Sequence, residues 1–117
     1  MTAIEHITTV VAKLGWQVES YTDKFGSVTF DFQQYTPYGQ DFSFSVGMND
    51  NDPESLLQEV DKYYENFDPD YEAYLWIGDN GHGKNGAPYH IKDIVNDMEQ
   101  VETMIGTLYE ALKTVLE

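Results

Sequence analysis

Hydrophobic residues recur along the chain with two different periods, and each change of period marks a new expected element. Near the N-terminus they follow one another three or four positions apart, which predicts an amphipathic helix. Its apolar positions are Ile4, Ile7, Val10, Val11 and Leu14. Thr2 and Glu5 have the spacing of a capping box, and Gly15 is placed to end the helix. We expect the first strand to follow over residues 16–21.

Two further segments alternate between apolar and polar residues, which predicts strands over residues 28–33 and 42–48. The apolar set is Val28, Phe30, Phe32, Phe42, Phe44, Val46 and Met48. Between the two segments, Pro37 and Gly39 occupy positions that a β-turn favours. The pattern therefore predicts a hairpin with one apolar face and one polar face.

A second helix is expected to begin at Asp52 and Pro53, which suit a helix cap and a first-turn proline. Its apolar stripe contains Leu56, Leu57, Val60, Tyr63, Tyr64 and Phe67, and its polar face Glu54, Gln58, Asp61, Lys62 and Glu65. For the next segment, 71–77, the alternating apolar residues favour a strand, although Pro69 could instead open a short helix.

Residues 78–88 read as a glycine-rich loop, and a long helix is expected from about Tyr89 to the end. The predicted order is therefore α-β-β-β-α-β-α. This order is typical of an α+β fold, in which helices cover one face of a mainly antiparallel sheet of three to four strands. We expect residues 1–117 to form a single domain.

The last helix also carries a seven-residue repeat of apolar positions. They are Ile91, Met98, Ile105 and Leu112 in one register, with Ile94, Val101, Leu108 and Val115 in the other. Such a helix would be about 40 Å long, more than a short sheet can cover. It could lie across the chain's own sheet or form a homodimer interface, for which the candidates are Ile105, Leu108 and Leu112.

The formal net charge is −15, from 21 acidic residues and six basic ones. All six are lysines, and a field of this sign repels nucleic acid and anionic membranes. We therefore expect a basic protein surface as the partner, with no direct binding to nucleic acid or membrane. The densest acidic stretch is 50–72, and its candidate partner-binding residues are Glu54, Asp61, Glu65, Asp68 and Asp70. The alternative is a solvated face that only maintains solubility.

The composition excludes several other classes of protein. There is no cysteine, so disulfides and thiolate zinc sites are ruled out. No apolar run approaches the ~20 residues of a membrane helix, and the N-terminus does not resemble a signal peptide, so we expect a cytoplasmic protein. Carboxylate pairs are frequent by chance in so acidic a chain, and no catalytic constellation accompanies them. We expect neither enzymatic activity nor a cofactor.

The loop 78–88 nearly matches a phosphate-binding loop, because a glycine and a Gly-Lys pair have the required spacing. Asn85 replaces the usual serine or threonine, and Gly86 to Pro88 delay the following helix. If the loop binds a ligand or a metal ion, the candidates are His82, Lys84 and Asn85. The histidines lack the paired spacing of a zinc site, so we expect no metal. A connecting loop or a partner-contact loop is the alternative.

Four stretches of the sequence resemble a known group of proteins. They are Gln34 to Phe44, Asn66 to Asp70, Leu75 to Ile77 and Gly83 to Pro88. The chain from Gly15 to Leu112 is similar to small acidic proteins encoded by bacterial phages, plasmids and conjugative elements. The resemblance implies a role in mobile-element biology, where small acidic proteins can block host defence by mimicking DNA. No activity is established for the group, so no functional residue carries over.

Overall fold

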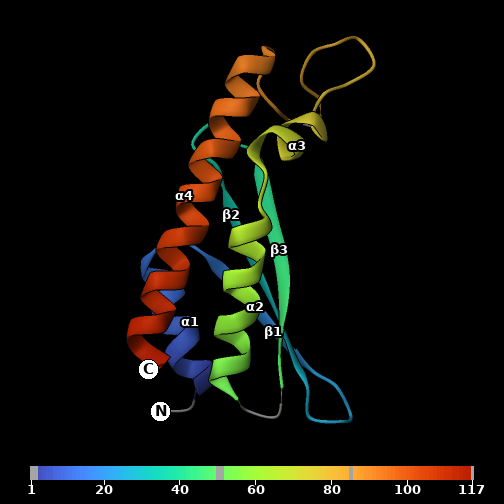
Figure 1. Ribbon diagram of the computed structural model, residues 1–117. Helices are drawn as coiled ribbons and strands as arrows, with labels where there is room; N and C mark the ends of the chain where they lie inside the picture. Colours follow the sequence, from blue (N-terminus) through green and yellow to red (C-terminus); the bar gives the residue numbers. More distant parts are fainter. Residues whose placement is uncertain (1–2, 50–51, 85, 117) are drawn as a thin grey trace.

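Within residues 3–49, 52–84 and 86–116, which the computed structural model describes, the chain forms four helices and three strands. Figure 1 shows them in the order α1 (Ala3–Lys13), β1 (Gln17–Thr22), β2 (Val28–Tyr35), β3 (Asp41–Met48), α2 (Pro53–Asn66), α3 (Pro69–Tyr74) and α4 (Ile91–Leu116). Thr2, the predicted cap of the first helix, lies outside the described residues, as do Asp50 and Asn85.

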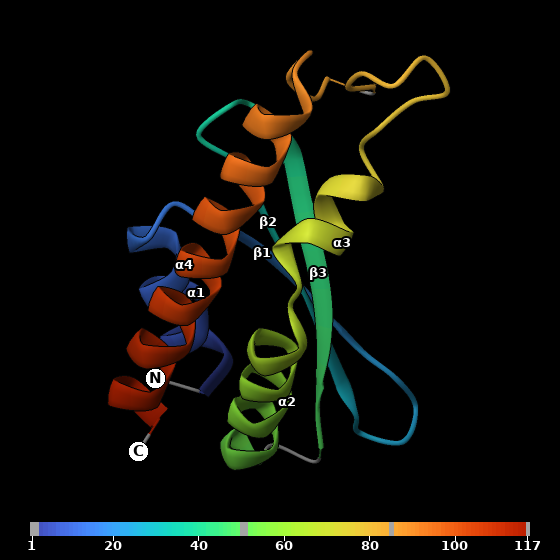
Figure 2. The same cartoon turned by 45° about the horizontal axis from the view of Figure 1, so that its top comes forward.

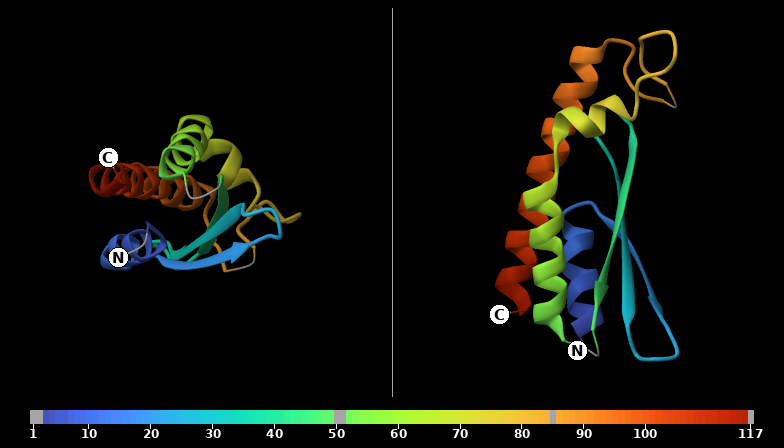
Figure 3. Two further views of the ribbon diagram at one scale, coloured as in Figure 1. Left: turned by 90° about the horizontal axis from the view of Figure 1, so that it is seen from below. Right: turned by 45° about the vertical axis from the view of Figure 1, so that its right-hand side comes forward.

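The three strands form one antiparallel sheet in the order β1-β2-β3, so β1 and β3 are its edges. The helices lie on one side of this sheet, and Figure 3 shows its other side uncovered by them. α1 packs beside β1, α2 packs beside β3, and α4 contacts both of these helices. The predicted α+β class, the antiparallel sheet, the covering of one face and the long last helix are all confirmed.

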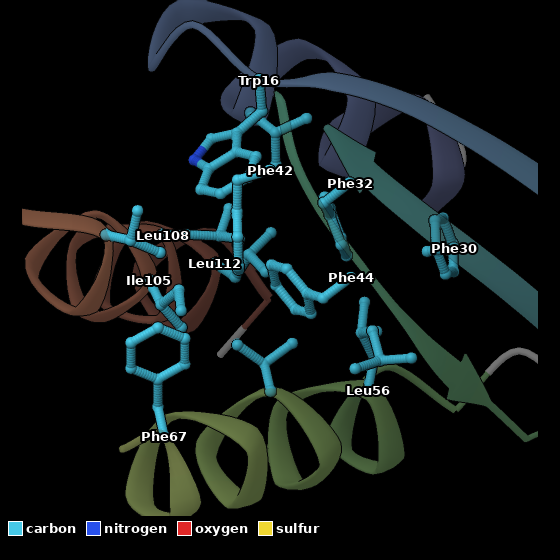
Figure 4. Packing of buried hydrophobic residues seen from close by; sticks show 14 of the residues in the cluster. Trp16, Phe30, Phe32, Phe42, Phe44, Leu56, Phe67, Ile105, Leu108 and Leu112 are labelled. Carbon is cyan, nitrogen blue, oxygen red and sulfur yellow. The ribbon is translucent and has the colours of Figure 1, made fainter. Parts of the chain in front are cut away.

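The core lies between the sheet and the helices, as the alternation of β2 and β3 predicts. Every second side chain of β3 is buried and every other one is exposed. Trp16 packs its ring edge-on against Phe32, Phe42 and Phe44, with ring centroids 5.8–6.4 Å apart (Figure 4). Burying a side chain of this kind stabilises the fold by about 2–3 kcal/mol, which is why this face is the covered one.

The prediction of a strand over 71–77 is wrong, because this segment begins with the short helix α3. Asp68 caps α3, and its carboxylate accepts the backbone N–H of Asp70 at 3.0 Å and of Tyr71 at 3.4 Å. Pro69 occupies the first turn, where its missing N–H costs nothing. Local capping therefore outweighs the short apolar alternation. Extended pairing is limited here to a single bridge between Ile77 and Gly83.

The apolar repeat of α4 faces the chain's own core. Ile105, Leu108 and Leu112 are each completely buried, together with Ile94, Met98 and Val101. α4 contacts both α1 and α2, and the repeat is exposed only at its two ends, where Ile91 is 44% and Val115 38% exposed. The prediction that Ile105, Leu108 and Leu112 form a homodimer interface is therefore wrong.

A buried carboxylate on α4 fixes the turn between β2 and β3. The Thr36 hydroxyl donates to one oxygen of Asp97, and the backbone N–H of Tyr38 donates to the other at 3.1 Å. The Thr36 hydroxyl in turn accepts the backbone N–H of Gln40 at 2.9 Å. Asp97 is 0% exposed, and a carboxylate is tolerated there only because donors surround it. The hairpin end is thereby attached to the first third of the long helix, near its N-terminus.

We expect Asp97→Ala to lower the free energy of unfolding by about 3 kcal/mol, because the Thr36 hydroxyl and the Tyr38 amide lose their acceptor. Urea denaturation followed by circular dichroism measures the change. Asn96→Ala is the matched control, since its side chain donates to the exposed Tyr38 hydroxyl and should cost no more than about 0.5 kcal/mol. Equal stabilities for the two variants would contradict the role given to Asp97.

Candidate functional site

The uncovered face of the sheet carries three carboxylates, one from each strand: Glu19, Asp31 and Asp41. They line a shallow hollow of about 380 Å³ together with Gln17, Gln33, Ser43 and Ser45. Ser45 donates its hydroxyl to Asp31, and Gln33 donates its side-chain amide to Asp41 at 2.7 Å. Glu19 and Asp31 are direct partners across the strands, a placement of like charges that destabilises a sheet.

The negative charge of this face is not compensated by neighbouring cations. In the part of the chain that the structure describes, none of the three carboxylates forms an ion pair with a lysine or histidine. Instead, Glu19 accepts the hydroxyl of Tyr21. This hydrogen bond, together with the charge of Glu19, raises the pKa of Tyr21 and keeps its hydroxyl protonated. A cation from another molecule would therefore meet carboxylates whose charge is not yet neutralised by a described residue.

A second hollow region follows the outer edge of β3, between this strand and the helices α2 and α3; we call it the edge groove. Its first part, about 310 Å³, is lined by Asp41, Phe42, Ser43, Tyr63, Glu72, Leu75 and Trp76. Its second part, about 250 Å³, is lined by Ser45, Val46, Glu59, Lys62, Tyr63 and Asn66. Each part is lined by consecutive residues of β3, and the side chains of consecutive strand residues point to opposite faces of the sheet. A hollow that contacts both kinds of side chain lies at the edge of the strand. α2 and α3 follow one another along β3 (Figure 2).

The backbone of β3 presents unpaired polar groups to this groove. The Thr36 N–H donates to the Gln40 carbonyl at 2.8 Å, so these two residues form a hydrogen-bonded pair. In an antiparallel ladder, hydrogen-bonded and non-hydrogen-bonded pairs alternate, so this pair tells which residues of β3 bond to β2. The even-numbered residues Phe42 to Met48 therefore bond to β2, while Asp41, Ser43, Ser45 and Gly47 direct their N–H and C=O groups outward. Among the described residues, no backbone or side-chain group bonds to these outward groups. β3 is thus an open sheet edge.

The inner wall of the edge groove contains two groups with raised pKa values. Burial raises the pKa of Tyr63 to about 12, with a further contribution from the charge of Glu72. Tyr63 stacks on Phe44 with ring centroids 4.4 Å apart, which holds its ring beneath the strand edge. Burial, followed by the charge of Asp68, raises the pKa of Glu72. The ionised form of Glu72 is therefore unfavourable in the folded chain, and a nearby cation would relieve it.

The helix α3 adds apolar surface at one end of the groove. Tyr71, Tyr74 and Leu75 are 59%, 69% and 48% exposed, respectively. Leu75 lines the groove itself, as does the half-buried Trp76 that follows it. Tyrosine and tryptophan are enriched where proteins bind one another, because they combine a large apolar area with a polar group. The groove thus has acidic, apolar and backbone hydrogen-bonding surfaces within one region.

The five acidic residues predicted from the sequence do not form one surface. Glu54, Asp61 and Glu65 share a stripe of α2 by helical spacing, on the side of the helix away from the edge groove. Glu54 and Glu65 are exposed, whereas Asp61 is half-buried. Asp68 and Asp70 belong to the start of α3, where Asp68 is the helix cap. The carboxylates of the sheet were not among the predicted site residues, although the polar positions of the predicted hairpin contained Asp31.

The loop 78–88 is closed by its own hydrogen bonds and projects from one end of the molecule (Figure 1). Backbone amides that donate within it or to its flanks are those of Gly78, Gly81, His82, Gly83, Lys84 and Ala87. These donors are therefore already used, whereas a phosphate-binding loop directs free amides at its ligand. The His82 ring stacks on Tyr89 at 3.9 Å between centroids, and the Lys84 side chain is exposed. Asn85, the third loop candidate, lies outside the described residues.

Two further observations concern other kinds of site. Over the described ranges, no three side chains of the histidine, aspartate or glutamate type come together in a way that would hold a metal ion. None of the helices in those ranges has both the length and the apolar composition needed to cross a membrane.

Comparisons of the chain with protein-family models, curated proteins and solved structures find no match. The resemblance to acidic proteins of mobile elements stays a prediction from the sequence.

We expect Gly83→Ala to open the loop without unfolding the core. A Cβ atom at this position would lie 1.9 Å from the Pro88 carbonyl oxygen, so the two sides of the loop must separate. Hydrogen exchange should become faster at the amides of Gly83 and Lys84, which bond to Tyr89 and Trp76. Gly78→Ala is the control, because its Cβ would make ordinary contacts of 3.4 Å or more. Unchanged exchange in Gly83→Ala would refute the closed loop.

We expect Glu72→Gln to raise stability at neutral pH and to have little effect in acid. Because the pKa of Glu72 is raised in the folded chain, its protonated form contributes stability at a pH below the ordinary pKa of a glutamate. This contribution is lost as the pH rises through the pKa that Glu72 has in the folded chain. Glutamine removes that loss, so the gain should be present at about pH 7 and absent at about pH 3. Urea denaturation at both values tests this. Glu65→Gln, at an exposed site, reports the general easing of repulsion. An equal gain in both variants would argue against a specific effect at Glu72.

Proposed function

We propose that this chain is a non-enzymatic interaction protein that binds a basic surface of another protein. The observation that carries the proposal is the group of three carboxylates on the uncovered sheet face, Glu19, Asp31 and Asp41, which have no cationic partner among the described residues. In a chain of net charge −15, the long-range field adds to this local charge. Such a field speeds the encounter with a basic partner and weakens as salt rises.

The more specific form of the proposal is mimicry of DNA in the cytoplasm of a bacterial host. A protein that binds DNA presents lysine and arginine to regularly spaced phosphates, and carboxylates on a rigid face can occupy the same basic channel. The resemblance to proteins of mobile elements supports this form, since host nucleic-acid-binding or defence enzymes are natural targets there. The partner is then defined by chemistry as a basic DNA-binding surface.

The alternative of a ligand-binding or metal-binding module in the loop 78–88 has weaker support. Most of the amides that a phosphate would need are engaged within the loop, and His82 is packed against Tyr89. The carboxylates of the sheet, by contrast, line an open hollow and have no cationic partner among the described residues.

Two variants that each remove three charges test the proposal. The sheet variant combines Glu19→Gln, Asp31→Asn and Asp41→Asn, and the helix variant combines Glu54→Gln, Asp61→Asn and Glu65→Gln. The probe is a basic DNA-binding domain, titrated at two salt concentrations with and without competing duplex DNA. We expect the sheet variant to bind about tenfold more weakly, which corresponds to about 1.4 kcal/mol. We expect the helix variant to remain close to wild type.

Circular dichroism first establishes that both variants are folded. Greater loss in the helix variant would move the binding surface to the stripe of α2 that the sequence analysis favoured. If both variants bind as tightly as wild type at every salt concentration, the acidic surface serves only solubility and the proposed function is wrong. If duplex DNA fails to compete, DNA mimicry is wrong while binding to a basic surface still holds.

A further inference from the structure

We propose that the edge of β3 accepts an extended segment of the partner protein as a fourth strand, and that basic and apolar residues alternate along this segment. The inference rests on the proposed function, because it specifies how a basic partner binds. It combines three features of one region: the unpaired backbone of β3, the apolar wall of the edge groove, and the carboxylates beside both.

The backbone of β3 supplies the affinity that does not depend on sequence. Asp41, Ser43, Ser45 and Gly47 direct their N–H and C=O groups away from β2, and no described residue bonds to them. An added strand would pair with these groups and extend the sheet from three strands to four. β3 is eight residues long, so a segment of similar length can pair along it.

The alternation follows from the two faces of the sheet. Successive side chains of an added strand point to opposite faces. On the uncovered face, the first of them would lie next to Asp41, where a lysine or arginine finds a carboxylate that has no cationic partner among the described residues. Those on the helical face would enter the edge groove against Tyr63, Leu75 and Trp76, which favours apolar side chains. A segment that is basic at one set of alternate positions and apolar at the other satisfies both faces.

Charge selects a basic partner rather than a second copy of this chain. Pairing of two β3 edges would bring the groove of one copy, which is lined by Asp41, Glu59 and Glu72, against the equally acidic groove of the other. These carboxylates line the groove with a single lysine, Lys62, among them. Like charges placed together cost stability, and each copy also carries a net charge of −15. A cationic segment would instead favour the ionised form of Glu72, whose pKa is raised by burial and, to a lesser extent, by the charge of Asp68.

The test uses the full chain, labelled with ¹⁵N, and a synthetic peptide of alternating lysine and valine that matches the length of β3, 8 residues. Two control peptides have the same length: in one, the backbone nitrogens of the two central residues are methylated, which removes an N–H that faces β3 in either strand orientation, and in the other, every lysine is replaced by glutamate. NMR titration gives the affinity and identifies the amides that respond. We expect the amides of Ser43, Ser45 and Gly47 to shift and to become protected from hydrogen exchange.

Proline substitution at the two sheet edges supplies matched variants. Ser43→Pro removes an outward N–H from β3, and Ser20→Pro removes an outward N–H from β1, the opposite edge. Both serines are exposed, and proline is tolerated at edge positions whose N–H faces solvent. We expect Ser43→Pro to weaken peptide binding roughly tenfold, whereas Ser20→Pro should stay within about twofold of wild type.

The outcomes separate this inference from the proposed function. Weaker binding of the N-methylated peptide and of Ser43→Pro, with β3 amides protected, supports strand addition. If the lysine peptide binds in a salt-dependent way but β3 amides do not respond, strand addition is wrong and the acidic surface still binds cations. If the amides of β1 respond instead, the peptide binds at the other edge of the sheet, and the assignment of the site to β3 is wrong. If the lysine and glutamate peptides bind equally, both proposals fail. Should Ser43→Pro not fold, the amide protection in the wild-type chain decides.

Discussion

Burial of only one face of the sheet is the constraint on which the rest of this structure depends. The side chains of β2 and β3 alternate, so the apolar set can be removed from water only if helices cover that one side. α1 and α2 cover the two margins of the sheet, and α4 fills the space that they leave. The opposite face must then carry polar side chains, and both sheet edges are left without a neighbouring strand. The candidate binding surfaces are therefore left open because the helices cover only one face of the sheet.

The acidic surface opposes this arrangement at particular positions. Glu19 lies across from Asp31, and Glu72 is partly buried within reach of the charge of Asp68. Neither pair gains stability from its proximity, since like charges repel and burial penalises an ionised carboxylate. The core, with its closely packed aromatic rings around Trp16 and Phe44, supplies the stability that offsets them. Groups held at a cost to the fold are typical of sites that act on another molecule.

Periodicity was sufficient to predict α1, α2, α4, the hairpin and the α+β class, because each depends on spacing along a single segment. It failed for residues 71–77, where the Asp68 cap and Pro69 decided the conformation rather than the apolar alternation. It also failed for α4, because a repeat of apolar positions does not specify whether the covering surface is the same chain or another copy. The candidate site was missed for a related reason: Glu19, Asp31 and Asp41 are distant in sequence and meet only through the strand register.

The attachment of the hairpin turn to Asp97 also has a consequence for the order in which the chain can fold. The strands β1, β2 and β3 are joined by short turns, so the sheet consists of local contacts that can form early. Its apolar face is covered fully only when α4, the last element, has packed against α1 and α2. During synthesis, Asp97 cannot hold the turn, and the part of the apolar face that α1 and α2 leave open stays exposed to water, until α4 has left the ribosome. In that interval the nascent chain is at its most prone to aggregate, and a chaperone that shields apolar strands would then protect it most.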